Sequence, residues 1–408
     1  MRKSLTIALC LAILALLAWV AAPALSLRPY IPGAVDFESS LPAAKRIDQT
    51  AKLRALASEE GEPAPSWISP PVSAPHRFDL VGVAKEMREI EIRVRDNGGE
   101  WSDWVPQDDA TPIYVDGADE AQVRAPFKPD GELHFVNVSG TSGGPVDRLL
   151  TTARQSINEA FIAVASTPVA QAIAPKPVIT PRALWGADNP DGGCPPRGAP
   201  ELGGAAAAVI HHTVNANDYT PEEAPGIVLG ICRFHVYGNG WNDIGYNALV
   251  DRYGTLYEGR AGGLKKPIVG AQAQGFNSVT TSIASIGDHT TELITPEATR
   301  SIIHYLAWRM AAIRAFPVRA HPVTGTVQLT SAGGSQSRYP AGAVVTVPRI
   351  VGHLTLGLTT CPGTIDPRIP AIRTAVQKRI KRYLKPRKKK GKKKRAAAGR
   401  AASASPHG

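Results

Sequence analysis

The 408-residue sequence predicts an α/β domain over residues 178–384, preceded by a small all-β sandwich over residues 75–138. Three observations support this organisation. Short runs of alternating apolar and polar residues, separated by turn signals, fill the first region, as is typical of antiparallel strands. In the second region, apolar runs suited to buried strands occur together with long segments at helical spacing. An amphipathic segment followed by Ala- and Pro-rich sequence lies between the two regions and indicates a linker.

Composition and charge fit a chain with at least one sizeable hydrophobic core. Hydrophobic residues make up 43% of the chain, which excludes disorder throughout. The net charge of +11 comes from the C-terminus, because residues 378–400 contain fourteen Lys and Arg and no acidic residue, and the rest of the chain carries about −3. A folded basic face for nucleic acid is therefore not indicated.

The N-terminus has the features of an export signal. Arg2 and Lys3 precede an apolar stretch over residues 5–20, and small residues of the kind that signal peptidase cuts follow at 22–24. We therefore expect residues 1–24 to be a signal peptide, although the apolar stretch is also long enough for an uncleaved membrane anchor. Both alternatives place the body of the protein outside the cytoplasm.

The sandwich is predicted from four β-type runs. They lie at residues 78–83, 89–95, 113–115 and 133–138, with turn signals at residues 96–99 and 129–131. Trp101 and Trp104 lie among these runs and either bridge the two sheets or stack on sugar rings. We assign the sandwich an accessory role, with linkers over residues 25–74 and 139–177 on either side.

The glycine-rich stretch at residues 139–145 is similar to the nucleophile loop of chymotrypsin-like proteases. Ser142 would then be a nucleophile, but Thr141 stands where that loop has Asp. The upstream region is also too short for the two barrels that carry the partner residues. We interpret this stretch as the exit from the sandwich, with a serine hydrolase as a remote alternative.

The α/β region alternates between predicted strands and helices. Strands are expected at residues 205–210, 246–251, 255–258 and 282–287, and helices at residues 225–237, 296–313 and 367–384. Pro225 fits a first helical turn, and Ile302, Leu306 and Ile313 share one helix face. A Gly- and Thr-rich insertion over residues 320–348 has β-type runs, which predict a hairpin beside the site.

Three cysteines remain if the export signal is removed with Cys10. If Cys194 and Cys232 form a disulfide in an oxidising compartment, Cys361 is a leftover thiol, and metal ligation is one role for it. The alternative is an unpaired buried cysteine.

A zinc site is the chemistry that the remaining motifs predict. His353 and Cys361 lie eight residues apart on one short loop, and His211 follows a buried strand. A catalytic zinc ion needs three protein ligands and an open fourth position for water. Two neutral imidazoles and one thiolate leave such a site with a charge of about +1, which can polarise an amide carbonyl.

Five blocks in order carry a resemblance to a known family. They are ITPRALWGA at residues 179–187, VIHHT at 209–213, WNDIGYN at 241–247 leading into LVDRYGTLYEGR at 249–260, SIG at 285–287 and HLTLGLTTCPG at 353–363. The pattern resembles the peptidoglycan recognition protein and zinc N-acetylmuramoyl-L-alanine amidase family, the type that includes the phage lysozyme-like amidases. The resemblance covers about residues 178–384 and implies an amidase domain with a mixed central β-sheet flanked by helices.

The resemblance implies a role for each site residue. His211, His353 and Cys361 would be the Zn²⁺ ligands, and Tyr246 would help to hold the water or the oxyanion. Thr359 occupies a position where family members carry Lys or Thr with a similar role. Similar domains that only bind peptidoglycan often lack the cysteine, so the implied function is a secreted peptidoglycan hydrolase that cleaves the amide between N-acetylmuramic acid and L-alanine.

One departure from the family supports an alternative function. Leu354 and Thr355 stand where the family usually shows Arg-Asp after its histidine, and this charged pair can brace the ligand loop. The alternative is a non-catalytic or weakly catalytic protein that recognises peptidoglycan in the cell envelope.

Five other histidines, Asp243 and the C-terminal tail are expected to have roles outside the zinc site. His212 is expected to be structural, His235 to be packed or to brace a loop, and Asp243 to hold its turn. His289, His304 and His321 have no partner at ligand spacing, so surface or core positions are expected.

Residues 385–408 are expected to form a basic tail. Either the tail is disordered and has no dedicated partner, or it is attracted to anionic envelope polymers or lipid headgroups. Nucleic acid is not the expected partner. We expect a bacterial, extracytoplasmic protein of unknown oligomeric state.

Overall fold

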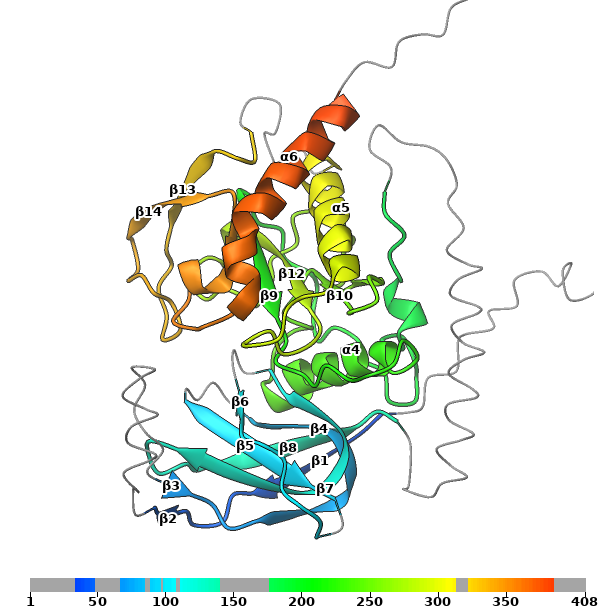
Figure 1. The fold of residues 1–408 in the computed structure, drawn as a ribbon, viewed down its shortest axis with the longest axis vertical. Helices are drawn as coiled ribbons and strands as arrows, with labels where there is room; N and C mark the ends of the chain where they lie inside the picture. Colours follow the sequence, from blue (N-terminus) through cyan, green and yellow to red (C-terminus); the bar gives the residue numbers. More distant parts are fainter. Residues whose placement is uncertain are drawn as a thin grey trace, which may run out of the picture.

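Within its described residues, the computed structural model has two larger β-sheets with one helix between them (Figure 1), and a two-stranded sheet beside the second. It describes residues 34–47, 67–84, 89–96, 98–107, 111–139, 176–312 and 322–384. The predicted export signal, Ser142, His321 and the basic tail lie outside the described residues.

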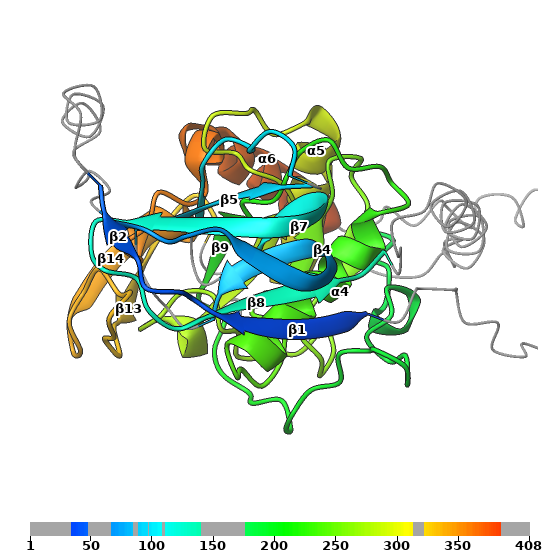
Figure 2. The ribbon, with the colours of Figure 1, turned by 90° about the horizontal axis from the view of Figure 1, so that it is seen from below.

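The N-terminal region is one antiparallel sheet of eight strands. These are β1 (Val35–Ser40), β2 (Lys45–Arg46), β3 (Trp67–Ile68), β4 (Val72–Val83), β5 (Ile90–Arg95), β6 (Val105–Gln107), β7 (Ile113–Ala125) and β8 (Glu132–Asn137). Their order is β1-β8-β4-β7-β3-β2, and β5 pairs with β7 and β6. Strands β1, β8, β4 and β7 lie side by side in Figure 2. The four predicted strands are confirmed.

The expectation of a two-sheet sandwich is wrong for this region. Strands β4 and β7 are the longest strands of the sheet, with 12 and 13 residues, and their pairing shifts register on either side of Phe78. Such irregularities bend a sheet and let it curve around its own core. Phe78, Ile92 and Phe135 form part of that core. A single curved sheet therefore encloses the core that two packed sheets were expected to enclose.

The expected linker over residues 25–74 is also corrected, because it contains strands β1 to β3. Strand β1 pairs with β8 over its whole length, from Val35 opposite Asn137 to Ser40 opposite Glu132. Phe37 stacks on Phe135 with ring centroids 5.3 Å apart. A single six-residue strand gives only a short alternating pattern, and its partner lies about a hundred residues away, so composition alone suggested a linker.

The two tryptophans contact arginine side chains of the curved sheet instead of bridging two sheets. The guanidinium of Arg93 lies 4.7 Å from the Trp101 ring and 4.5 Å from the Trp104 ring. Arg95 and Arg124 lie over Trp101 and Trp104 at 4.4 and 4.5 Å. These cation–π contacts give the indole faces a partner without a second sheet.

The C-terminal region has a mixed sheet, as expected, and it contains one strand more than the four that were predicted. Its strands are β9 (Ala207–His212), β10 (Ala248–Val250), β11 (Leu256–Glu258), β12 (Thr280–Ser285) and β15 (Ile350–Gly352), in the order β11-β10-β12-β9-β15. Strands β10, β12, β9 and β15 are parallel, whereas β11 pairs with β10 as the predicted antiparallel hairpin. The insertion forms a second hairpin, β13 (Thr326–Thr330) with β14 (Val344–Pro348), which confirms that prediction.

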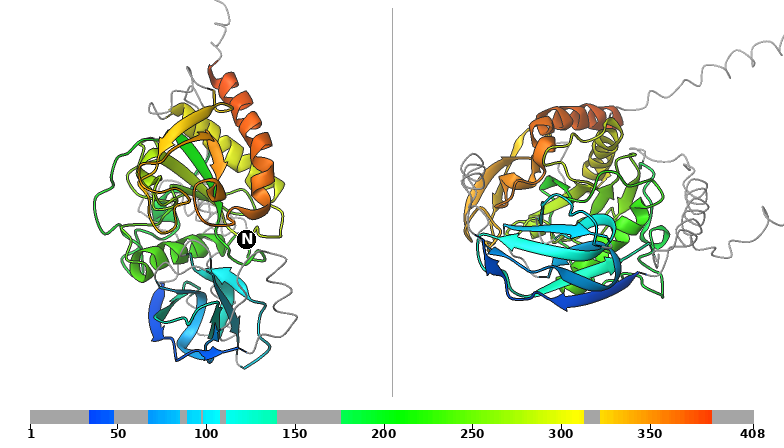
Figure 3. Two further views of the ribbon diagram at one scale, coloured as in Figure 1. Left: turned by 90° about the vertical axis from the view of Figure 1, so that its left-hand side faces the viewer. Right: turned by 60° about the horizontal axis from the view of Figure 1, so that its bottom comes forward.

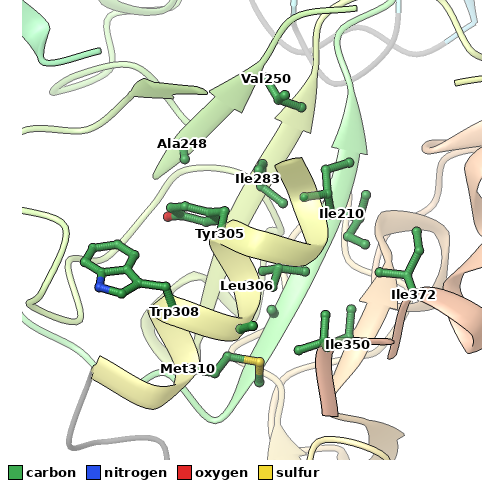
Figure 4. Close-up of a cluster of buried hydrophobic side chains, with 14 of the residues drawn as sticks. Ile210, Ala248, Val250, Ile283, Tyr305, Leu306, Trp308, Met310, Ile350 and Ile372 are labelled. Carbon is green, nitrogen blue, oxygen red and sulfur yellow. The ribbon is translucent and has the colours of Figure 1, made fainter. Parts of the chain in front are cut away.

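Helices cover both faces of the mixed sheet. They are α4 (Ala224–Arg233), continued by a π-helical turn (Phe234–Gly238), α5 (Pro296–Ala312) and α6 (Ile369–Leu384). Short 3₁₀ turns lie at Arg182–Leu184, Asn277–Val279, His353–Thr355 and Gly363–Arg368. Helices α5 and α6 pack on one face through residues that include Leu306 and Ile372, against Ile210, Ile283 and Ile350 of the sheet (Figure 4). None of the helices in the described ranges is long and apolar enough to span a membrane.

Helix α4 lies between the two sheets, where Figure 3 shows it from the side. It is apolar on nearly every side and buried along its length, as expected for a helix packed on two faces. Ile227 and Phe234 share one core with Leu80 and Val136 of the N-terminal sheet. A Cβ at Gly230 would lie 2.4 Å from Leu80, so glycine permits this close contact.

The structure shows the disulfide that was considered for two of the cysteines. Cys194 and Cys232 are bonded, which ties α4 to the segment before β9. Cys361 is a free, buried thiol.

Candidate metal centre

Three buried side chains, those of His211, His353 and Cys361, converge on one point. Their candidate ligand atoms all lie within 4.8 Å of one another. The Sγ atom of Cys361 is 3.7 Å from Nδ1 of His211, and the two imidazole centroids are 4.5 Å apart. The structure therefore brings together all three residues of the predicted ligand set, and two imidazoles with one thiol are a donor set that zinc favours.

Strand register explains why residues so far apart in sequence meet. Strands β9 and β15 are parallel neighbours, with Gly352 opposite Ile210. The next residues along the two strands are His353 and His211, at the shared carboxyl edge of the sheet, where α/β folds commonly place functional groups. Side chains alternate along a strand, so His211 faces the side of Val209, away from Ile210.

Gln272 fixes the protonation of His211. The hydroxyl of Thr280 donates to the carbonyl of Phe276 (2.8 Å), so it accepts from Nε2 of Gln272 (2.8 Å). The amide oxygen of Gln272 then faces Nε2 of His211 at 2.7 Å. Because this oxygen can only accept, Nε2 of His211 carries the proton. The lone pair of Nδ1 is therefore directed towards Cys361, which is the tautomer that a metal ligand needs.

The loop that carries Cys361 is held by backbone hydrogen bonds. The backbone N–H of His212 donates to Sγ of Cys361 at 3.4 Å, a contact that favours the thiolate. The N–H of Cys361 donates to the hydroxyl of Thr359 at 3.0 Å, and the N–H of Leu354 donates to the carbonyl of Cys361 at 2.7 Å. Thr359 thus lies on the ligand loop, where it shapes the turn before the thiol.

The insertion forms hydrogen bonds with the loop that follows His353, the loop that an Arg-Asp pair was expected to support. Arg338, between β13 and β14, donates through Nε to the carbonyl of Leu354 at 3.0 Å. Its backbone N–H donates to the carbonyl of Leu356, and the N–H of Leu358 donates to the carbonyl of Gln336, both at 2.9 Å. The hairpin predicted beside the site therefore supports the segment that carries both His353 and Cys361.

Tyr246 lies beside the ligand cluster. Its ring centroid is 5.3 Å from that of His211, and the side chain is buried. The preceding Gly245 donates its N–H to Nδ1 of His235 at 3.2 Å. A Cβ at Gly245 would lie 2.4 Å from the carbonyl oxygen of Ala271, so only glycine fits this approach. The segment therefore holds the phenol in one place next to His211.

Comparison with known proteins covers the part of the chain that carries the side chains of His211, His353 and Cys361. Residues 204–364 match the N-acetylmuramoyl-L-alanine amidase family. Peptidoglycan-recognition protein SC2 of Drosophila simulans is 31% identical over 160 residues, which cover 38% of this chain and 67% of that protein. The chain belongs to this amidase and peptidoglycan-recognition protein family.

Two further relatives of the amidase family show how much of the chain the likeness covers. The N-acetylmuramoyl-L-alanine amidase of Homo sapiens is 31% identical over 218 residues, which are 52% of this chain and 33% of that protein. A solved structure of peptidoglycan recognition protein-LE in complex with tracheal cytotoxin is 26% identical, with a TM-score of 0.32. That match covers 45% of this chain and 87% of the other.

Three polar residues of the amidase-family domain have structural contacts, as expected. Nδ1 of His212 accepts from the N–H of His289 at 2.9 Å. The ring of His235 stacks on Trp241 with centroids 4.6 Å apart. The two carboxylate oxygens of Asp243 accept from the N–H groups of Ile244 and Ala261, both at 2.8 Å. None of these contacts requires a metal.

Sequence reasoning missed Gln272 and Arg338. Gln272 lies in a loop, and its partner His211 is 61 residues away. Arg338 lies in the insertion and acts on backbone atoms, so no side-chain pattern marks it. A polar residue near a glycine-rich stretch is too common a signal to identify either one.

We expect Gln272→Ala to weaken zinc binding. The variant loses the acceptor that keeps the proton on Nε2 of His211, so the imidazole becomes free to change tautomer and to rotate. Loss of such an outer contact typically lowers metal affinity about 10- to 100-fold. Competition with a chromophoric chelator measures the affinity, with the exposed Gln328→Ala as the matched control. Equal affinities for Gln272→Ala and the parent would contradict the assignment.

His289 should make stability fall in mildly acidic solution. Nδ1 of His289 faces the carbonyl of Glu292 at 3.2 Å and so donates to it, which leaves Nε2 to accept from Ser285 at 2.9 Å. Burial lowers the pKa of His289 below its ordinary value of 6.5. The unfolded chain therefore takes up a proton first, and stability that is present above about pH 6.5 is lost as the pH falls towards the folded pKa.

The size of this effect is at most about 1.4 kcal/mol per pH unit. Urea unfolding at pH 7.5 and pH 5, with chelator present so that metal loss does not contribute, measures it. We expect the free energy of unfolding to depend less on pH in His289→Gln than in the parent. Identical pH dependence in both proteins would show that His289 titrates normally.

His304, which was also expected at a surface or core position, is half-buried on α5.

Proposed function

We propose that this protein is a secreted, zinc-dependent N-acetylmuramoyl-L-alanine amidase of a bacterial cell envelope. It would hydrolyse the amide between the lactyl group of N-acetylmuramic acid and L-alanine in peptidoglycan. The observation that supports this most is the convergence of His211, His353 and Cys361, with Nδ1 of His211 deprotonated towards the thiol. Family membership supplies the substrate class.

The three residues fit a resident zinc ion by their chemistry. Two neutral nitrogens and one thiolate are three protein ligands, which is the number found in catalytic zinc sites. A bound zinc ion acts as a Lewis acid that polarises the amide carbonyl and brings water into its nucleophilic form near neutral pH. The N–H of His212 donates to Sγ of Cys361, a contact that favours the thiolate which a zinc ion would bind.

Tyr246 and Thr359 are proposed to act on the substrate side of the ligands. The phenol of Tyr246 has one proton, which it can donate to the oxyanion that forms when the carbonyl carbon becomes tetrahedral. Thr359 has a half-exposed hydroxyl close in sequence to Cys361 and can assist in holding the water. When the C–N bond breaks, a proton must reach the leaving amine of L-alanine, and Tyr246 is a candidate donor.

The alternative is a protein that recognises peptidoglycan without cleaving it. Recognition alone requires no set of metal ligands with a fixed tautomer, so the built donor set favours catalysis over recognition. The contact from Arg338 to the carbonyl of Leu354 also supports the loop that lacks the charged pair after His353, and so weakens one argument for the alternative. The partner in both cases is peptidoglycan, with anionic envelope polymers or lipid headgroups proposed for the basic tail.

The test is turnover on purified muropeptides. The mature protein should bind one zinc ion per chain and release stem peptides, and a chelator should stop release until zinc is added back. His211→Ala should lose both zinc and turnover. Binding to muropeptides without any release in the presence of zinc would reject the enzyme and support the recognition protein.

A further inference from the structure

The N-terminal region contacts a tyrosine of the candidate site directly, through a residue that precedes one of its strands. The hydroxyl of Thr111, just before β7, lies 3.1 Å from the hydroxyl of Tyr246. Thr111 is 2% exposed and Tyr246 is 3% exposed. Burial of both side chains makes this hydrogen bond costly to lose. Thr111 lies outside the residues that match the family.

Backbone contacts fix the segment that carries Thr111. The side-chain amide of Asn215 donates to the carbonyl of Pro112 at 3.1 Å. The N–H of Ala216 donates to the carbonyl of Tyr114 at 3.3 Å. Asn215 and Ala216 closely follow β9, the strand that ends with His211 and His212. The start of β7 is therefore attached to the same part of the chain that carries a ligand.

The two regions are also joined away from the site. Arg233 of α4 forms a two-pronged ion pair with Asp36 of β1, with N–O distances of 2.8 and 2.9 Å. Leu80 and Val136 of the curved sheet share a core with Ile227 of α4, which lies between the sheets in Figures 1 and 3. The N-terminal region is thus packed against α4 as well as at the site.

The direction of the hydrogen bond decides what it does. The phenol of Tyr246 has one proton. If Thr111 donates to the phenol oxygen, that proton stays available for the substrate, and the ring is held beside His211. If Tyr246 donates to Thr111 instead, its proton is occupied and the contact opposes the reaction. The two directions predict opposite effects when the Thr111 hydroxyl is removed.

We propose that Thr111 is a positioning residue for the amidase reaction, donating its hydroxyl proton to the oxygen of Tyr246 so that the phenol is oriented with its own proton towards the scissile amide. This inference rests on the proposed function. The N-terminal sheet then supplies, from outside the family domain, a part of the site that the family domain does not contain.

The test compares Thr111→Val with Thr111→Ser in the full-length mature protein. We expect Thr111→Val to lower kcat on muropeptides about tenfold with KM little changed, because one oriented hydrogen bond is lost. Thr111→Ser keeps the hydroxyl and should restore kcat to within about twofold. In a Tyr246→Phe background, Thr111→Val should have no further effect, because the two residues act as one unit. Asp36→Asn weakens the packing elsewhere and serves as the control, with kcat unchanged.

A second measurement needs neither zinc nor turnover. In chelator-treated protein, the same double-mutant cycle on urea unfolding should show a coupling of about fivefold in the unfolding equilibrium constant. Additive effects, an unchanged kcat in Thr111→Val, or a kcat that rises would each overturn the inference. If the parent itself releases no stem peptide, the proposed function fails instead, and the unfolding cycle still reports whether Thr111 and Tyr246 are coupled.

Discussion

Cys361→Ala should lower kcat on muropeptides about a thousandfold or more while leaving the protein folded. The variant keeps both imidazoles but loses the only thiol among the three candidate ligands. Lewis-acid stabilisation by a metal contributes several kcal/mol to the transition state, and about 4 kcal/mol corresponds to roughly a thousandfold in rate. Alanine fills most of the space of the buried side chain, so the fold should survive.

The measurement pairs kinetics with zinc content. Cys361→Ala should hold far less than one zinc ion per chain after dialysis, and added zinc should not restore activity. The matched control is the parent protein treated with chelator, which should recover fully when zinc is returned. Circular dichroism and binding to insoluble peptidoglycan should be unchanged in the variant. Full activity in Cys361→Ala would show that the thiol is not a ligand in catalysis.

Removal of the Cys194–Cys232 disulfide should cause a large loss of stability. The bond closes a loop with a sequence separation of 38 residues. A cross-link of this span restricts the unfolded chain enough to stabilise the fold by about 4 kcal/mol in the chain-entropy account. It also holds α4, which packs between the sheets, to the segment before β9. The double variant Cys194→Ala/Cys232→Ala should therefore unfold at much lower urea concentration.

The same variant separates stability from chemistry. Under conditions where it remains folded, its kcat should stay close to that of the parent, because neither cysteine lies in the ligand cluster. Reduction of the parent with dithiothreitol should give the same loss of stability. If the double variant unfolds at the same urea concentration as the parent, the bond contributes little to the fold.

Sequence alone could predict the candidate ligand set because each of its three residues lies in a local motif. His353 and Cys361 share one loop, and His211 ends an apolar run that had to be a buried strand. The parallel pairing of β9 with β15 then brings the two histidines together. The α/β elements were predictable for a similar reason, since buried strands and amphipathic helices repeat their pattern within one segment.

The rest depends on contacts between distant segments. Gln272 and Thr111 reach His211 and Tyr246 across 61 and 135 residues, and no periodicity marks a side chain that makes one long-range hydrogen bond. The single curved sheet was missed because local alternation shows that strands exist but not how many sheets they form. Strand β1 was missed because its pairing with β8 gives no local signal.

The insertion shows how a departure from a family pattern can be offset. Leu354 and Thr355 cannot form the expected charged brace, and sequence reasoning therefore kept a non-catalytic or weakly catalytic recognition protein as the alternative. Arg338 and Gln336 contact the backbone of the same loop instead. Backbone contacts do not depend on which side chains the loop carries, so the support survives the change in sequence.

The most direct test of the central claim is mass analysis of the products released from purified cell-wall peptidoglycan. The parent protein with zinc should release stem peptides with a free amino group on L-alanine and leave glycan with an intact lactyl carboxylate on its muramic acid. The chelator-treated parent protein and Cys361→Ala should produce neither of these two products. Cleavage at any other bond, or an unchanged digest while the protein remains bound to the wall, would contradict the amidase account.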